Sequence, residues 1–184
     1  MRFAIVSEVR TGSELLREYL VNSGLPVCRE LVHSDGTYED GWLEVMLNSE
    51  AIKIHRTTLL LDMCEPVRSF LIRERVPVIW LWRRNKVQQY ISYARAVKTG
   101  KWQGRSPCTN IRISGSAMSA MIRAWCESEE YLIDEYPDRF DITYEWMTGL
   151  GGQACLHELG SWLGREVVPR SQCSRSGACH VEFI

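Results

Sequence analysis

The sequence predicts an α/β protein, a three-layer α/β/α domain with a central parallel sheet of about four to five strands. Short apolar runs alternate with longer stretches in which apolar residues recur every three to four positions. The run at 78–82, VIWLW, is apolar throughout, as expected of a strand buried on both faces. Strands joined through helices form parallel units, so we expect one domain over residues 1–184, with a polar tail from about residue 169.

The first half of the chain is expected to hold two strands. Residues 3–7 form an apolar strand, and the helix after it ends near Gly24 because glycine closes helices. A short helix at 42–47 precedes a second strand at 51–55. The segment 57–75 is expected to be helical with a break or restart near Pro66, since proline lacks the N–H that a helix interior needs.

The second half adds two more strands. After the strand at 78–82, Asn85 followed by Gln88 indicates a helix cap, and Ser92 then lies about two turns into the helix, on a face that can point back to the sheet. A polar loop is expected at 101–112. The remaining elements are a helix at 117–136, a strand at 140–144 and a closing helix at about 154–163.

Composition and charge argue against several classes of function. The formal net charge is -1, which gives no bulk attraction to nucleic acid or to an acidic membrane. No segment approaches the roughly 20 apolar residues that span a bilayer, and the first apolar run is too short for a secretory signal. We therefore expect a cytoplasmic protein without a nucleic acid partner or integral membrane association.

The seven cysteines include no CxxC pair, so neither a zinc ribbon nor a fully paired disulfide framework is expected. Reduced, partly buried thiols are the simpler interpretation. Only Cys173 and Cys179, in the polar tail beside His180, are candidates for pairing or for binding a metal. We expect no metal site.

The turn after the first strand is a candidate anion site. The strand ends in EVRTGS and opens directly into a helix, which places backbone N–H groups, a small hydroxyl and the charge of Arg10 around one point. The pattern GxxxxGK[ST] is absent, which disfavours ATP or GTP hydrolysis of the usual kind. Glycine in such a turn also has a packing explanation, so the turn alone leaves both interpretations open.

Together these segments resemble the sulfotransferases that use 3′-phosphoadenosine 5′-phosphosulfate (PAPS), especially the small bacterial carbohydrate-type members. The family pattern [RK]-[ST]-G-[ST]-x-L-L, which holds the 5′-phosphosulfate, is matched by RTGSELL at 10–16. Its Arg with a Ser eight positions on, which binds the 3′-phosphate, is matched by Arg84 and Ser92. The TYE at 143–145 is similar to a fourth-strand pattern whose Tyr packs near the adenine, and HELGSWLGREV resembles the closing helix.

The resemblance implies a P-loop-NTPase-like sulfotransferase fold and transfer of a sulfuryl group from PAPS to a hydroxyl of a small-molecule or carbohydrate acceptor. It also implies a nucleotide-binding set consisting of Arg10, Thr11, Gly12, Ser13, Glu14, Arg84, Ser92 and Tyr144. Glu14 departs from the family, which usually has Thr or Ser there. A carboxylate 4 Å from a phosphosulfate would cost about 4 kcal/mol, so we expect Glu14 to point away and to pair with Arg17.

Sulfuryl transfer needs a cation at the leaving phosphate and a base for the acceptor proton. Arg10 is the candidate cation. His55 resembles the base of cytosolic relatives, which follows a Lys-x-His pattern, while Glu30 resembles the acidic residue after the first helix of small bacterial members. Both stay candidates, and we favour His55 because a strand end is better fixed than a loop. Lys53 either steadies the sulfate or reaches to solvent.

Two other functions stay open. The same fold without catalysis would give a nucleotide-binding module, which Glu14 favours. A small P-loop kinase is a weaker alternative because the Walker lysine is missing. The sequence specifies neither the acceptor nor the oligomeric state.

Overall fold

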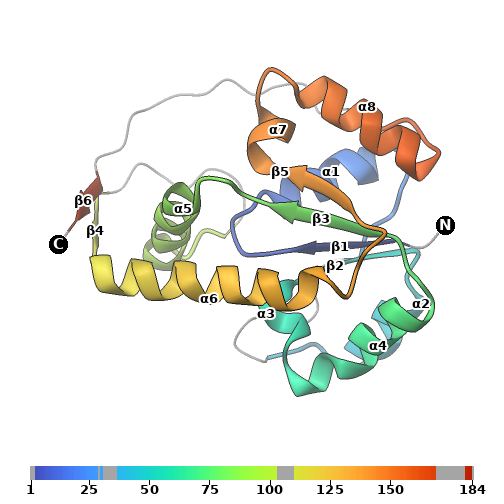
Figure 1. Ribbon diagram of the computed structural model, residues 1–184, viewed down its shortest axis with the longest axis horizontal. Coiled ribbons are helices and arrows are strands. Elements are labelled where there is room, and N and C mark those ends of the chain that lie inside the picture. Colours follow the sequence, from blue (N-terminus) through green and yellow to red (C-terminus); the bar gives the residue numbers. More distant parts are fainter. Residues whose placement is uncertain (1–2, 29, 31–36, 103–109, 169–180, 184) are drawn as a thin grey trace.

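The centre of the molecule is a sheet of four parallel strands in the order β2-β1-β3-β5 (Figure 1). The computed structural model describes residues 3–28, 30, 37–102, 110–168 and 181–183. The four strands are β1 (Phe3–Ser7), β2 (Ala51–His55), β3 (Val78–Trp82) and β5 (Phe140–Thr143). Ser7 lies opposite His55 and Leu81, and Trp82 lies opposite Thr143. All four strands therefore end at one edge of the sheet, where parallel sheets bind ligands.

The first three strands are confirmed residue by residue, and the fourth is one residue shorter than predicted. The Thr143 hydroxyl accepts a hydrogen bond of 3.0 Å from the Trp146 N–H, so Thr143 caps the short helix α7 (Tyr144–Thr148). Because that cap starts a helix, Tyr144 belongs to α7 and not to the strand. It still lies at the carboxyl edge of the sheet.

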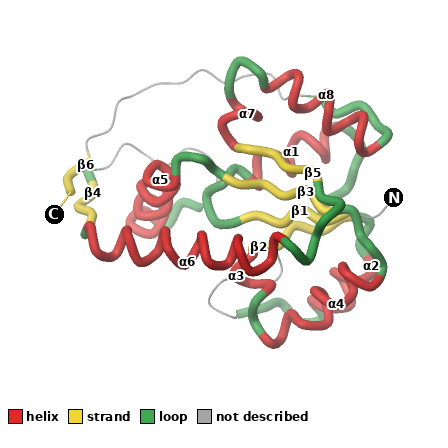
Figure 2. The backbone as a smooth tube through the Cα atoms, in the orientation of Figure 1, coloured by secondary structure: helices red, strands yellow, loops and turns green. Residues whose placement is uncertain are grey.

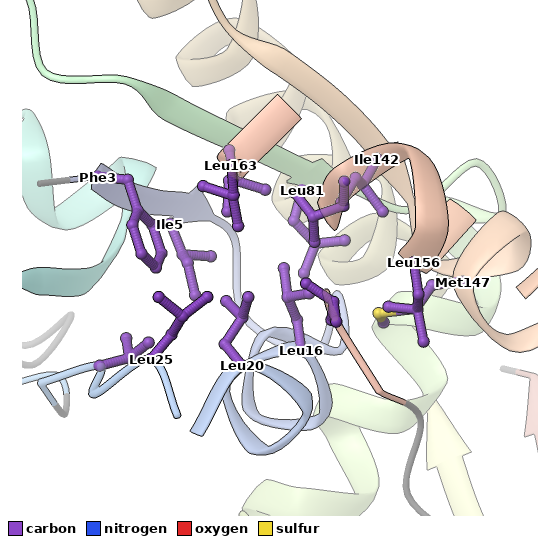
Figure 3. Close-up of a cluster of buried hydrophobic side chains, with 14 of the residues drawn as sticks. Phe3, Ile5, Leu16, Leu20, Leu25, Leu81, Ile142, Met147, Leu156 and Leu163 are labelled. Carbon is purple, nitrogen blue, oxygen red and sulfur yellow. The ribbon is translucent and has the colours of Figure 1, made fainter. Parts of the chain in front are cut away.

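Helices cover both faces of the sheet, which agrees with the predicted three layers. One face packs on α1 (Ser13–Asn22) and α8 (Gly152–Leu163), and Figure 3 shows the buried side chains between them. The other face packs on α2 (Trp42–Asn48), α4 (Glu65–Arg73) and α6 (Gly115–Ile133). In β1 the alternation is strict, since Phe3 and Ile5 face α1 while Ala4 and Val6 face the opposite layer.

The helical segment predicted at 57–75 restarts near Pro66, as expected. The chain forms α3 (Arg56–Leu59), a 3₁₀ turn η1 (Asp62–Cys64) and then α4, which begins at Glu65. Pro66 lies in the first turn of α4, where its missing N–H would have no partner in the helix. The other predicted helices are found within a turn of their expected ends.

The helix α5 (Lys86–Thr99) lies beyond the carboxyl ends of β1 and β3 (Figures 1 and 2). Its predicted cap is confirmed, because the Asn85 side chain accepts a hydrogen bond of 2.9 Å from the Gln88 N–H. After α5 the predicted polar loop ends in a strand that we did not expect. This strand, β4 (Ile111–Ile113), pairs in parallel with β6 (Val181–Phe183).

Several predictions concern residues outside the described part of the chain. These are most of the polar loop, with Gly104 and Pro107, and the tail with Cys173, Cys179 and His180. Four cysteines are described as free thiols, as predicted: Cys28, Cys64, Cys126 and Cys155. Among the described residues, no helix has the length and apolarity that crossing a membrane requires.

A buried ion network joins two strand ends to α6. Arg56, at the start of α3, is fully buried, and its guanidinium lies over the Trp80 ring at 5.2 Å from the ring centroid. Its Nη1 is 3.2 Å from Glu129 Oε2 without the alignment of a hydrogen bond. The same oxygen accepts a hydrogen bond of 3.1 Å from Lys86 Nζ at the start of α5. Glu129 therefore balances the charges of Arg56 and Lys86. Arg56 directly follows His55, and Lys86 is two residues after Arg84.

We predict that Glu129→Ala lowers the free energy of unfolding by about 3 kcal/mol, because it leaves the buried Arg56 charge without a counter-ion. The measurement is urea denaturation at neutral pH. Glu130→Ala is the matched control, since Glu130 is the exposed neighbour in the same helix and its loss should cost under about 0.5 kcal/mol. Equal small losses in both variants would show that the network does not stabilise the fold.

Candidate anion-binding site at the carboxyl edge of the sheet

The turn between β1 and α1 is compact and contains two residues with left-handed backbone. Arg10 has φ 61° and Gly12 has φ 93°. The Thr11 hydroxyl donates a hydrogen bond of 2.7 Å to the Glu8 carbonyl, which closes the turn. The first backbone N–H groups of α1 have no partner inside the helix, and the helix dipole adds positive potential there. The turn thus gathers several donors in front of Ser13.

A buried carboxylate anchors this turn to the end of the neighbouring strand. Glu8 is 1% exposed. Its Oε1 accepts hydrogen bonds from the Val9 N–H at 3.0 Å and from the Thr57 hydroxyl at 3.1 Å. Since Thr57 lies in α3, just after β2, Glu8 fixes the turn relative to the β2 end of the sheet.

The helix α5 covers the other side of the turn. Arg10 Nε donates a hydrogen bond of 2.9 Å to the Ser92 hydroxyl, and Arg10 Nη1 donates to the Trp102 backbone carbonyl. Gln89, fully buried, donates a hydrogen bond of 2.8 Å from Nε2 to the Val9 carbonyl. Ser92 therefore points back toward the first turn, as predicted, and two motifs 82 residues apart meet at one place.

Arg83 is the arginine that lies beside Arg10. Its guanidinium carbon is 4.3 Å from the centroid of the Tyr144 ring, and its Nη1 donates a hydrogen bond of 3.5 Å to the Arg10 carbonyl. Burial, together with the neighbouring charge of Arg83, lowers the pKa of the Arg10 guanidinium. Two guanidinium groups in one partly buried place repel each other, and an anion between them would relieve that repulsion.

The sequence predicts Arg84 as a nucleotide-binding residue, and its side chain is more exposed than that of Arg83. The Arg84 side chain is exposed, while its backbone N–H donates a hydrogen bond of 3.0 Å to Glu145 Oε2. The alternation of side chains along β3 could have identified Arg83. Ile79 and Leu81 face α1, so Arg83, two residues after Leu81, is expected on the same side. Arg84 is then expected on the opposite side.

The TYE segment at 143–145 packs on the turn after β1 and binds the loop after β3. A Cβ atom added to Gly12 would lie 2.6 Å from Tyr144 Cδ2, so the tyrosine ring packs directly on the turn. Glu145 accepts hydrogen bonds from the backbone N–H groups of Arg84 and Asn85 at 3.0 and 3.1 Å. Partial burial raises the pKa of Glu145, but these hydrogen bonds and the charge of Arg83 outweigh it and leave the pKa below its usual value.

A chain of ion pairs runs from α1 to the end of β2. Arg17 contacts Glu14 at 2.6 Å, and Lys53 Nζ lies 3.3 Å from Glu14 and 3.8 Å from Glu30. The predicted pairing of Glu14 with Arg17 is confirmed, and the contact with Lys53 is additional. Burial raises the pKa of Glu14, but the Arg17 hydrogen bond and the Lys53 charge reverse this and lower it. The Lys53 ammonium lies between carboxylates and does not extend into solvent.

The two alternative bases meet at the end of this chain of ion pairs. His55 Nδ1 lies 2.7 Å from Glu30 Oε1, and both side chains are about nine-tenths buried, with 13% and 14% of their surface exposed. The contact arises because Cys28 pairs alongside Ile52, which carries Glu30 along the outer edge of β2. The contact lacks the alignment of a hydrogen bond, since Glu30 Oε1 has no hydrogen-bond partner among the described residues. It is a close approach of a carboxylate to an imidazole ring, which can carry its proton on either nitrogen.

No family model matches this chain, and no curated protein matches it. Within the described ranges, no three His, Cys, Asp or Glu side chains gather into a group that could hold a metal ion. The site combines a helix N-terminus, two adjacent guanidinium groups and a histidine 2.7 Å from a carboxylate.

We predict that Gly12→Ala is more destabilising than Gly24→Ala. Both glycines have positive φ, so alanine costs about 1 to 2 kcal/mol at either position. At Gly24 no atom lies within 4 Å of the added Cβ, whereas at Gly12 the Tyr144 ring must move, which adds about 1 to 3 kcal/mol. Urea denaturation measures the difference. Equal losses would mean that Tyr144 does not pack on the turn as described.

Proposed function

We propose that this protein is a PAPS-dependent sulfotransferase with a P-loop-like α/β fold that acts in the cytoplasm on a small-molecule or carbohydrate hydroxyl. The observation that supports it most strongly is the pair of guanidinium groups, Arg10 and Arg83, in front of the α1 N-terminus. An anionic nucleotide fits that arrangement because it meets two cations and the positive end of a helix dipole. The resemblance of the same segments to the sulfotransferase motifs adds the choice of nucleotide.

In this proposal the phosphosulfate lies on the turn that includes Arg10, Thr11, Gly12 and Ser13. Ser92 and Arg84 hold the 3′-phosphate, as the resemblance implies, and Tyr144 lies near the adenine. Arg83 joins the set as a second cation. Glu14, whose carboxylate binds Arg17 and Lys53, is directed away from the nucleotide, so its charge does not oppose binding.

The chemistry assigns separate tasks to the two halves of the site. His55 Nε2 takes the proton of the acceptor hydroxyl as its oxygen forms a bond to sulfur. The bond from sulfur to the bridging oxygen breaks, and the products are a sulfate ester and adenosine 3′,5′-bisphosphate. Charge develops on the leaving 5′-phosphate, where the guanidinium of Arg10 stabilises it. Glu30 orients His55 and stabilises the imidazolium, while Lys53 positions Glu30 and does not itself contact the sulfate.

A thermal-shift comparison of adenosine 3′,5′-bisphosphate with ATP tests the proposal. A ligand present at 100 times its Kd adds about 2.7 kcal/mol of stability, so the bisphosphate should raise the Tm and ATP should not. Stabilisation by ATP alone would favour the kinase alternative and contradict the proposal. Binding of the bisphosphate without sulfuryl transfer from PAPS to any hydroxyl acceptor would favour the inactive nucleotide-binding module.

We predict that Arg10→Ala and Arg83→Ala each weaken bisphosphate binding by about 10 to 100-fold, the effect of losing a charged hydrogen bond. Isothermal titration calorimetry measures the affinity. Arg123→Ala, at an exposed position of α6, is the charge-matched control and should bind normally. Arg84→Ala, measured in the same series, shows which of the two neighbouring arginines contributes more to the bisphosphate affinity. Normal affinity in the Arg10 and Arg83 variants would remove the anion site.

We predict that His55→Ala lowers kcat/KM by about 10² to 10⁴-fold, since it removes the base. Glu30→Gln should lower it less, and the double variant should be no slower than His55→Ala because both residues act through one group. His157→Ala, an exposed histidine of α8, is the control. If the two losses multiply in the double variant, Glu30 acts independently of His55 and becomes the better candidate for the base.

A further inference from the structure

The helix α5 carries a third arginine next to the candidate site. Two residues of this helix, three positions apart, contact the turn between β1 and α1. Gln89 donates a hydrogen bond to the Val9 carbonyl, and the Ser92 hydroxyl accepts one from Arg10 Nε. Arg95 is the next residue at this spacing. Residues three positions apart are neighbours on a helix surface, with Cβ atoms about 5 to 6 Å apart, so the Arg95 side chain begins beside Ser92.

The chain contacts Arg10 both before and after Arg95. Ser92 contacts it from α5, and the Trp102 carbonyl contacts it three residues after that helix. Gly100, with φ 66°, ends the helix in the left-handed conformation that glycine adopts without strain. Arg95 therefore belongs to the segment that borders the Arg10 guanidinium.

The guanidinium group of Arg95 has an incomplete set of hydrogen bonds. The side chain is half-buried, and its Nε is buried without a hydrogen-bond partner in the part of the chain that the structure describes. The same is true of Arg83 Nε, which belongs to the candidate site. By contrast, Arg17 Nε donates a hydrogen bond to Glu14. A buried donor without an acceptor costs free energy, and the oxygens of an anionic ligand would supply the acceptor.

A phosphate group needs more at this place than Ser92 can give. Near neutral pH a phosphate monoester carries about 1.5 to 2 negative charges on three acceptor oxygens. The Ser92 hydroxyl has one hydrogen to donate, and its oxygen already accepts from Arg10. The Arg84 side chain is exposed, and the strand alternation places it opposite to Arg83. Arg95 lies on the same helix surface as Ser92, and its fork of N–H groups matches the geometry of a phosphate.

We propose that Arg95 binds the 3′-phosphate of the nucleotide together with Ser92, and that this contact selects a 3′-phosphorylated nucleotide over one with a 5′-phosphate alone. Arg10 and Arg83 bind the 5′ end at the start of α1, so the two anionic ends of the ligand meet different arginines. Arg84, in the loop after β3, contributes less to the 3′-phosphate than Arg95 does. This inference rests on the proposed function, because it assigns a specificity residue to the nucleotide site of that reaction.

The test is isothermal titration calorimetry of the full-length protein with two ligands that differ only in the 3′-phosphate, adenosine 3′,5′-bisphosphate and adenosine 5′-monophosphate. We expect the unaltered protein to bind the bisphosphate at least about 10-fold more tightly, the effect of a charged hydrogen bond. Arg95→Gln should bring the two affinities within about 3-fold of each other by weakening the bisphosphate alone. Arg84→Gln should keep a preference of about 5-fold or more, and Arg123→Gln, at an exposed position of α6, should leave it unchanged.

Two further measurements separate charge from position and contact from folding. Adenosine 2′,5′-bisphosphate has the same charge as the 3′,5′ isomer and should bind more weakly, because its second phosphate is displaced from Ser92. Arg95→Lys keeps the charge without the fork and should give a preference between those of the unaltered protein and Arg95→Gln. The affinity for the monophosphate shows that the 5′ end of the site is intact in each variant.

A preference for the 3′-phosphate that survives in both Arg95→Gln and Arg95→Lys would overturn the inference, and so would a preference lost only in Arg84→Gln. Equal weakening of both ligands by Arg95→Gln would also overturn it, because Arg95 would then act at the 5′ end or on the fold. In each of these cases the bisphosphate binds the unaltered protein, so the proposed function stands. If the unaltered protein binds neither ligand, the proposed function fails and this inference fails with it.

Discussion

The proximity of two guanidinium groups, those of Arg10 and Arg83, is the constraint around which the carboxyl edge of this sheet is built. Like charges in a partly buried place stay together only where neighbouring groups hold them. Ser92 of α5 and the Trp102 carbonyl, three residues after that helix, hold Arg10, and the Tyr144 ring lies under Arg83. Glu145 Oε1 lies 3.8 Å from Arg83 Nε and offsets part of this positive charge, and an anionic ligand would offset more of it.

The carboxylates around the site have separate tasks, although they lie within one sheet edge. Glu8 fixes the first turn to α3, and Glu145 fixes the loop after β3 through two backbone N–H groups. Glu129 balances the buried charge of Arg56 behind β2. Glu30 Oε1 lies 2.7 Å from His55 Nδ1 at the end of β2. Most of the charged residues near the site therefore support the few that would touch a substrate.

Much of the fold was predictable because burial on both faces produces continuous apolar strands, as in 78–82, and because a cap such as Asn85 acts locally. What was missed depends on contacts between distant segments. Arg83 was not predicted, because its position beside Arg10 becomes visible only when the residues of β3 that face α1 are known. The pairing of Glu30 with His55 follows from the bridge of Cys28 to Ile52, which no local pattern predicts.

The most direct measurement of the central claim is a crystal structure of the protein with adenosine 3′,5′-bisphosphate. The account predicts that the 5′-phosphate lies within hydrogen-bonding distance of the backbone N–H groups at the start of α1 and of the guanidinium groups of Arg10 and Arg83. It predicts also that the 3′-phosphate lies by Ser92. A bisphosphate bound elsewhere, with Arg10 and Arg83 contacting no phosphate oxygen, would contradict it.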